Sequence, residues 1–185
     1  MFSIGGTGWM LLFAAVAGLV SLVVGLAVGR RLGGLAGLAW FGLLWSLAVI
    51  GIVTLIPAQD GLGYIPANDH ATSCSWDLGG PAPGGFWIFG GGQQLLNTLL
   101  FVPAGAFLAL AFARWRAGRV LVPLGLLALA AYSLGIEEIQ LHVARLDRAC
   151  DVTDILDNVS GALLGVAVGV ALLPLARPWR ARRRG

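Results

Sequence analysis

The chain contains very little charge and no lysine. Only 11% of its 185 residues are Asp, Glu, Lys or Arg, and all 12 basic residues are arginines. An ordinary soluble domain has about 25% charged residues. Hydrophobic residues make up 58% of the chain, and the mean hydropathy is +0.86. This composition excludes an ordinary soluble domain and indicates an integral membrane protein.

Several motifs that carry known chemistry are also missing. The chain has no glycine-rich phosphate loop, no dinucleotide fingerprint and no C-x-x-C pair. Its 2 cysteines and 2 histidines do not show a convincing metal-ligand spacing. The net charge of +3 does not indicate nucleic-acid binding, because the arginines concentrate where a membrane-topology rule would place them. We therefore expect no cofactor, no resident metal and no nucleic-acid partner.

What the chain does have is a set of five long apolar runs. About 20 apolar residues in a helix are needed to cross a hydrocarbon core about 30 Å thick. The predicted spans are residues 9–29, 35–56, 94–113, 120–143 and 152–173. Pro57 and Pro174 are expected to end the second and fifth. Because Arg30 and Arg31 follow the first run and no basic region precedes it, we interpret that run as a retained span rather than a cleaved signal peptide. The predicted fold class is all-α, a polytopic bundle of five transmembrane helices.

The same pattern predicts four regions. Residues 1–56 form two N-terminal helices, and residues 57–93 form an extracytoplasmic loop rich in glycine and proline. Residues 94–173 form a three-helix core, and residues 174–185 form an arginine-rich cytoplasmic tail. Ten of the 12 arginines lie in residues 30–31, 114–119 and 177–184, which five spans place on one side. The positive-inside rule makes that side cytoplasmic, with the N-terminus outside and the C-terminus inside. We expect a multi-pass protein of the bacterial plasma membrane.

The stretch from residue 133 to residue 169 holds six of the nine acidic residues. Polar groups held between spans at a membrane edge are the default place to look for function. Glu137 and Gln140 share a helix face because they are three residues apart, so we expect Glu137 to point inward and Glu138 toward the headgroups. The predicted ligand-binding cluster comprises Asn97, Glu137, Gln140, Arg148, Asp151, Asp154 and Asn158.

A stripe of small residues continues this cluster along the last span. Asp154, Asn158 and Gly161 follow one another at helical spacing, and Gly165 and Gly169 extend the stripe as a repeated G-x-x-x-G. Such glycines let a second helix approach closely, and that approach would carry Asp154 and Asn158 into the bundle. The alternative for Asp151 and Asp154 is helix capping at the start of the span.

Three other polar residues have open interpretations. Arg148 either neutralises neighbouring acids or binds a phosphate or carboxylate through its planar guanidinium. His142 either transfers protons or simply lies at the interface. Glu137, Asp151 and Asp154 are of the type that Mg²⁺ or Ca²⁺ prefers, but the pattern does not favour a metal site over the others.

The two cysteines, Cys74 and Cys150, lie in segments that the predicted topology places outside the membrane. That compartment is oxidising, so the pair is predicted to form a disulfide. The bond would hold the 58–92 loop over the polar cluster as a lid. The alternative is two unrelated thiols.

Three pieces of the sequence resemble the VanZ-like family of bacterial membrane proteins. They are N-T-L-L-F-V-P-A-G at 97–105, E-E-I-Q at 137–140, and R-A-C-D-V-T-D-I-L-D-N-V-S-G-A-L-L-G at 148–165. The likeness extends in order and character over about residues 50 to 170. The resemblance implies an association with low-level resistance to glycopeptide antibiotics of the teicoplanin type.

The function that we expect is recognition of a lipid headgroup or lipid-linked cell-envelope intermediate at the outer leaflet. Two alternatives remain open at this point. One is a membrane enzyme in which a buried carboxylate, Glu137 or Asp154, acts as acid or base on a lipid-linked substrate. The other is a small proton-coupled transporter, although the sequence places no charge near the middle of any span.

Overall fold

The computed structural model describes residues 5–57, 73–76, 92–113, 115–142 and 151–176. These residues form five helices: α1 (Thr7–Leu32), α2 (Gly34–Leu55), α3 (Gly92–Phe112), α4 (Gly118–His142) and α5 (Val152–Ala176). All five are long and apolar enough to cross a membrane, and the described residues contain no strand. The predicted all-α fold with five spans is confirmed.

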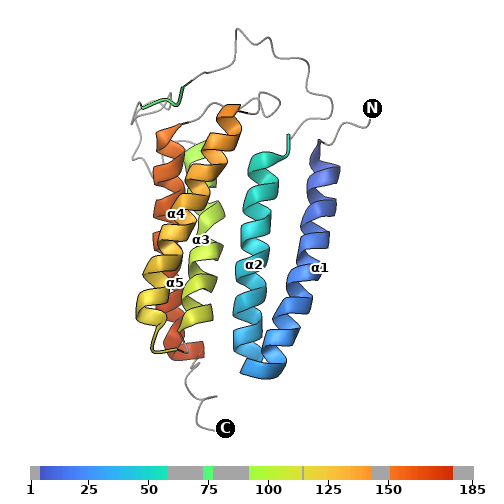
Figure 1. Cartoon of the computed structure of the whole chain (residues 1–185), viewed down its shortest axis with the longest axis vertical. Helices are drawn as coiled ribbons and strands as arrows, with labels where there is room; N and C mark the ends of the chain where they lie inside the picture. Colours follow the sequence, from blue (N-terminus) through green and yellow to red (C-terminus); the bar gives the residue numbers. More distant parts are fainter. Residues whose placement is uncertain (1–4, 58–72, 77–91, 114, 143–150, 177–185) are drawn as a thin grey trace.

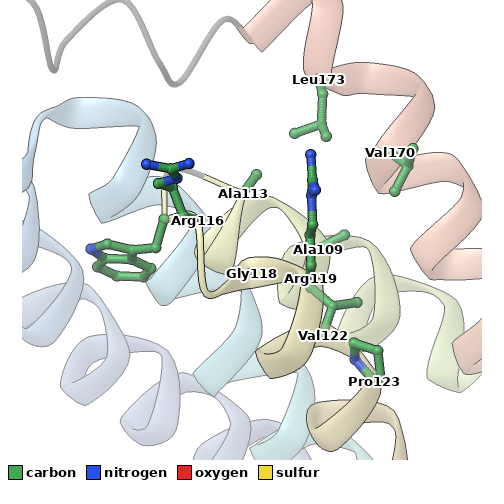
Figure 2. Close-up of a pocket in the computed structure, with 10 residues that line it drawn as sticks. Ala109, Ala113, Arg116, Gly118, Arg119, Val122, Pro123, Val170 and Leu173 are labelled. Carbon is green, nitrogen blue, oxygen red and sulfur yellow. The ribbon is translucent and has the colours of Figure 1, made fainter.

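The helices run side by side along one common direction (Figure 1). Helices α3, α4 and α5 form one group, α2 packs on α3, and α1 lies at the edge against α2. One end of the bundle holds the end of α2, the start of α3, the end of α4 and the start of α5. We call this the polar end. At the opposite end, the turn between α3 and α4 and the last turns of α5 border a cavity (Figure 2).

Glycine and proline set the ends of α1 and α2. Gly33 alone separates α1 from α2, and its φ of 99° is a conformation that glycine adopts without strain. Ile56 is extended and closes α2, as expected for a residue that precedes a proline. The predicted end of the fifth helix is wrong, because α5 continues through Pro174 to Ala176. A proline so close to the end of a membrane helix removes one hydrogen bond without stopping the last turn.

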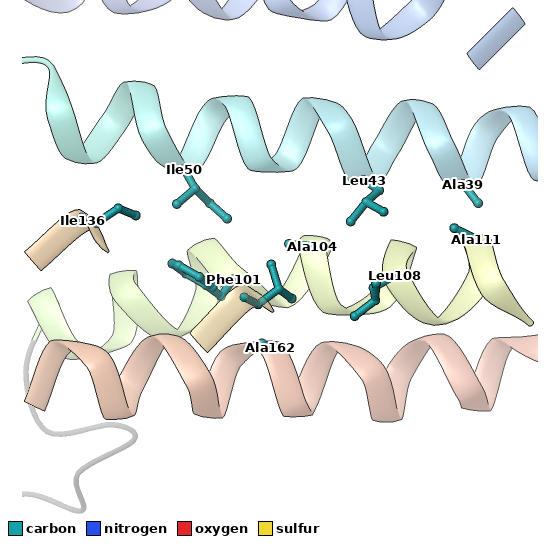
Figure 3. Packing of buried hydrophobic residues seen from close by; sticks show 10 residues of the cluster. Ala39, Leu43, Ile50, Phe101, Ala104, Leu108, Ala111, Ile136 and Ala162 are labelled. Carbon is teal, nitrogen blue, oxygen red and sulfur yellow. The ribbon is translucent and has the colours of Figure 1, made fainter. Parts of the chain in front are cut away.

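Helix α3 is central to the apolar core (Figure 3). Phe101 is fully buried on α3 and Ile50 is fully buried on α2, so these two helices share one packed layer. The large side chains of α1 are mostly exposed, as suits a helix whose outer face meets lipid. The buried cluster consists of Ala39, Leu43, Ile50, Phe101, Ala104, Leu108, Ala111, Leu129, Ile136 and Ala162.

The closest helix contact joins α3 and α5. A Cβ atom built on Gly161 would lie well within 3.0 Å of the carbonyl oxygen of Thr98, a separation that real Cβ atoms do not show. Gly165 faces the carbonyl of Val102 in the same way, and Gly169 faces that of Ala106. The backbones of the two helices therefore touch along three successive turns. This is the geometry that small residues permit between membrane helices.

The orientation of the bundle remains a prediction, and reporter fusions can test it. Fusions after Arg116 and at Gly185 should be fluorescent with a cytoplasmic reporter, because the positive-inside rule places both arginine-rich segments inside. The same sites should be inactive with a reporter that works only outside the membrane. Activity of the external reporter at either site would overturn the predicted topology.

Candidate functional site

Three helices bring polar side chains into the interior at the polar end of the bundle. The last two turns of α4 carry Glu137 and Gln140, each with only 2% of its surface exposed. The second turn of α5 carries Asp157, which is fully buried, and Asn158, which is 4% exposed. Buried polar groups at membrane depth are costly unless they have partners. We call the buried set Thr98, Ser133, Glu137, Gln140, Asp157 and Asn158 the polar cluster.

Glu137 connects the end of α4 to the start of α5. Its Oε2 accepts a hydrogen bond from the backbone N–H of Asp151 at 3.1 Å. The Asp151 carboxylate in turn accepts a hydrogen bond from the backbone N–H of Thr153 at 2.8 Å, so it caps the first turn of α5. The structure thus places Asp151 in the capping role that sequence reasoning kept as an alternative, with its backbone rather than its carboxylate directed at Glu137.

The two buried amides form hydrogen bonds between helices. Gln140 Nε2 donates to the carbonyl oxygen of Thr54 at 3.0 Å, which ties α4 to the last turn of α2. Asn158 Nδ2 donates to Ser133 Oγ at 2.9 Å, which ties α5 to α4. These bonds satisfy donors that would otherwise face hydrocarbon. The two bonds also fix the positions of α2, α4 and α5 relative to one another, at the depth where the carboxylates lie.

Asp157 is the residue that sequence reasoning missed. It is 0% exposed, and among the described residues neither of its carboxylate oxygens has a hydrogen-bond partner. The hydroxyl oxygen of Thr98 on α3 is also buried and has no hydrogen-bond partner among the described residues. A spacing signal was present, because Asp157 lies four residues before Gly161 and so continues the 161–165–169 glycine stripe toward the start of α5.

The other predicted residues lie around this cluster. Asn97 and Asp154 are half-buried, on α3 and α5 respectively. Glu138 points outward, where its Oε1 lies 3.6 Å from His142 Nδ1, and both side chains are exposed. His142 is therefore a surface residue at the end of α4. Arg148 and Cys150 lie outside the described residues.

A short piece of the long loop reaches this end of the bundle. Ser75 forms an isolated parallel bridge with Asp151, and the N–H of Val152 donates to the carbonyl oxygen of Ser75 at 3.1 Å. The backbone beside Cys74 therefore meets the backbone at the start of α5. Within the described residues, no three His, Cys, Asp or Glu side chains converge in a way that could hold a metal ion.

Comparison with known proteins identifies the family. The VanZ/LLP1 family model matches residues 35–173, which include α2 to α5 up to Leu173 and leave α1 outside. No curated protein and no solved structure matches the chain. The match covers most of the chain and includes every residue of the polar cluster, so the resemblance noted in the sequence is confirmed. The protein is a membrane protein of the VanZ/LLP1 family.

Proposed function

We propose that the polar cluster recognises the headgroup of a membrane lipid or of a lipid-linked cell-envelope intermediate. The observation that carries this proposal is the state of Asp157, a fully buried carboxylate without a hydrogen-bond donor among the described residues. Buried polar groups in native proteins are almost always hydrogen-bonded, and exceptions call for an explanation such as a missing ligand. A ligand that supplies the donors is such an explanation.

The chemistry of the cluster limits what that ligand can be. An ionised carboxylate only accepts hydrogen bonds, so a ligand that binds Asp157 in its ionised form must present hydroxyl, amide or ammonium donors. Sugar and amino-acid headgroups of envelope intermediates carry such groups, and so do several phospholipid headgroups. The ligand also needs an apolar part, because the cluster is enclosed by three apolar helices.

The location of the cluster supports the same class of ligand. The arginine distribution predicts that the polar end faces outward, on the side of the membrane where the cell envelope lies. Binding of such an intermediate would connect the chain to the glycopeptide resistance associated with its family, because glycopeptides act on the envelope. Protection against teicoplanin is therefore part of the proposal.

Native mass spectrometry of the protein extracted in mild detergent tests the proposal. The wild-type protein should retain one lipid-class molecule of defined mass. Asp157→Asn and Glu137→Gln should reduce its occupancy about 10-fold or more, the effect of losing one charged hydrogen bond of about 1.5–3 kcal/mol. Asp154→Asn, at the half-buried rim, should reduce it less. The matched control is Glu138→Gln, because Glu138 is adjacent in sequence but exposed.

Two outcomes would contradict the proposal. One is full lipid occupancy in both Asp157→Asn and Glu137→Gln. The other is failure of both variants to accumulate in the membrane while Glu138→Gln accumulates normally, which would make the cluster a structural element. Cells that carry the wild-type chain should also tolerate more teicoplanin than cells that carry Asp157→Asn.

Acid–base catalysis on the same ligand is a second candidate. The observation that favours it is the burial of two carboxylates, Glu137 and Asp157, on neighbouring helices at the same end of the bundle. Such an enzyme would convert its ligand, so the mass of the retained molecule would change during incubation with wild-type protein. Simple recognition leaves the mass unchanged.

A further inference from the structure

The end of the bundle opposite the polar cluster contains a cavity of about 590 Å³ (Figure 2). It lies between the last turn of α3, the start of α4 and the end of α5. Its volume falls within the range of small-molecule binding sites, roughly 300–1,000 Å³. The lining residues are Ala109, Ala113, Trp115, Arg116, Gly118, Arg119, Val122, Pro123, Val170 and Leu173.

Two arginines give this cavity a positive edge. Arg116 belongs to the turn between α3 and α4, and Arg119 lies in the first turn of α4, with its side chain extending toward Leu173 of α5 (Figure 2). In the part of the chain that the structure describes, neither guanidinium forms a salt bridge with a carboxylate. The acidic residues of that part all lie near the polar end, on α4, on α5 or at Asp151 directly before α5. Among the described residues, the two cations of the cavity therefore have no counter-ion.

The rest of the cavity wall is apolar. Ala109 and Ala113 contribute from α3, Val122 from α4, and Val170 and Leu173 from α5. These residues are in or next to membrane-spanning segments, so the wall continues into the hydrocarbon region. A site with cations at its rim and an apolar wall below them matches the two halves of a phospholipid. A free anion would use only the rim.

We propose that this cavity binds an anionic phospholipid. The phosphate lies between Arg116 and Arg119, and one acyl chain follows the apolar wall formed by Val122, Val170 and Leu173. Guanidinium groups bind phosphate through paired hydrogen bonds, and the start of α4 adds the favourable field of a helix N-terminus. Basic pockets between transmembrane helices at a membrane surface are typical sites for anionic lipid headgroups.

The test is competitive lipid binding to the purified full-length chain, read by native mass spectrometry. With equal amounts of phosphatidylglycerol and phosphatidylcholine, the wild-type protein should retain the anionic lipid preferentially. Each arginine near a membrane surface contributes about five-fold in affinity for anionic lipid. The Arg116→Gln/Arg119→Gln double variant should therefore reduce the preference roughly 25-fold if the two effects add.

The matched control is the Arg30→Gln/Arg31→Gln double variant. It removes the same charge at the same end of the bundle, from exposed positions at the end of α1 that do not line the cavity. The preference for phosphatidylglycerol should survive this change. An equal loss in both double variants would mean that net surface charge attracts the lipid, and would overturn the proposal.

A second pair of variants tests the apolar wall without changing charge. Val170 and Val168 are similarly exposed on α5, at 51% and 47%, but only Val170 lines the cavity, so Val170→Trp adds bulk at the cavity wall and Val168→Trp adds it elsewhere. Only the first should weaken retention of phosphatidylglycerol. Inorganic phosphate at millimolar concentration should not displace the lipid, and displacement would assign the cavity to a small anion instead. The polar-cluster variants should leave this preference intact, so failure of one proposal is distinguishable from failure of the other.

Discussion

A Gly161→Ala variant should lose at least about 3 kcal/mol of stability, at the upper end of the usual cost of overpacking a core. The added methyl group would meet the backbone carbonyl of Thr98, which cannot rotate away as a side chain can. The strain is relieved only if α5 moves away from α3 as a whole. Gly165→Ala should behave in the same way against Val102. Reversible unfolding in mixed micelles, followed by the fluorescence of the chain's 7 tryptophans, measures the loss.

Gly135→Ala is the control for this prediction. Gly135 is also inside a transmembrane helix, but a Cβ atom there would meet nothing within 4 Å. Alanine favours a helix over glycine by about 1 kcal/mol, so this variant should be as stable as the wild type or slightly more so. Equal stability of Gly161→Ala and Gly135→Ala would show that the close contact of α3 with α5 does not hold the bundle together.

Reduction of the predicted disulfide between Cys74 and Cys150 should have the other large effect. The bond would close a loop of about 75 residues, which the chain-entropy account values at about 4–4.5 kcal/mol as an upper figure. Cys150 lies outside the described residues, so the pairing remains a prediction. It is supported by the bridge between Ser75 and Asp151, each of which is next to one of the cysteines in sequence.

Unfolding with and without a reducing agent measures this effect. The reducing agent should destabilise the wild-type chain but should leave a Cys74→Ser/Cys150→Ser double variant unchanged, because that variant has no bond to reduce. The double variant should also expose the polar end to water-soluble reagents if the 58–92 loop covers it. Quantitative labelling of both wild-type cysteines before reduction would contradict the pairing.

The sequence predicted the five helices well because length and apolarity alone decide whether a segment spans a membrane. Helix ends that local geometry determines, such as the end of α2 before Pro57, could also be predicted from the sequence. The end of α5 could not be predicted in this way, because the surroundings of a proline in a terminal turn decide whether the helix continues through it.

The residues of the candidate site could be predicted from the sequence only in part. The three-residue spacing of Glu137 and Gln140 led to the buried face of α4, where the structure places both. From Gly161, however, steps of three and of four residues lead to Asn158 and Asp157, and both directions lie near the glycine face. Only the packing of α3 on α5 shows that Asp157 is fully buried. The hydrogen bond from Gln140 to the Thr54 carbonyl could not be predicted from the sequence either, since the two residues lie 86 positions apart on different helices.

The pairing of α3 with α5 also constrains how the chain is made. Helix α4 separates the two in sequence, so a ribosome delivers α3 and α4 to the membrane before α5 exists. When α5 arrives, it brings Asp157 and Asn158 toward a hydrocarbon environment, where an acidic side chain costs about 2.5–3.5 kcal/mol at the centre of the membrane and less near the end of a span. Docking of its glycine face on α3 removes both side chains from lipid in the same movement. We therefore expect membrane insertion of the last helix and completion of the polar cluster to be coupled during biosynthesis.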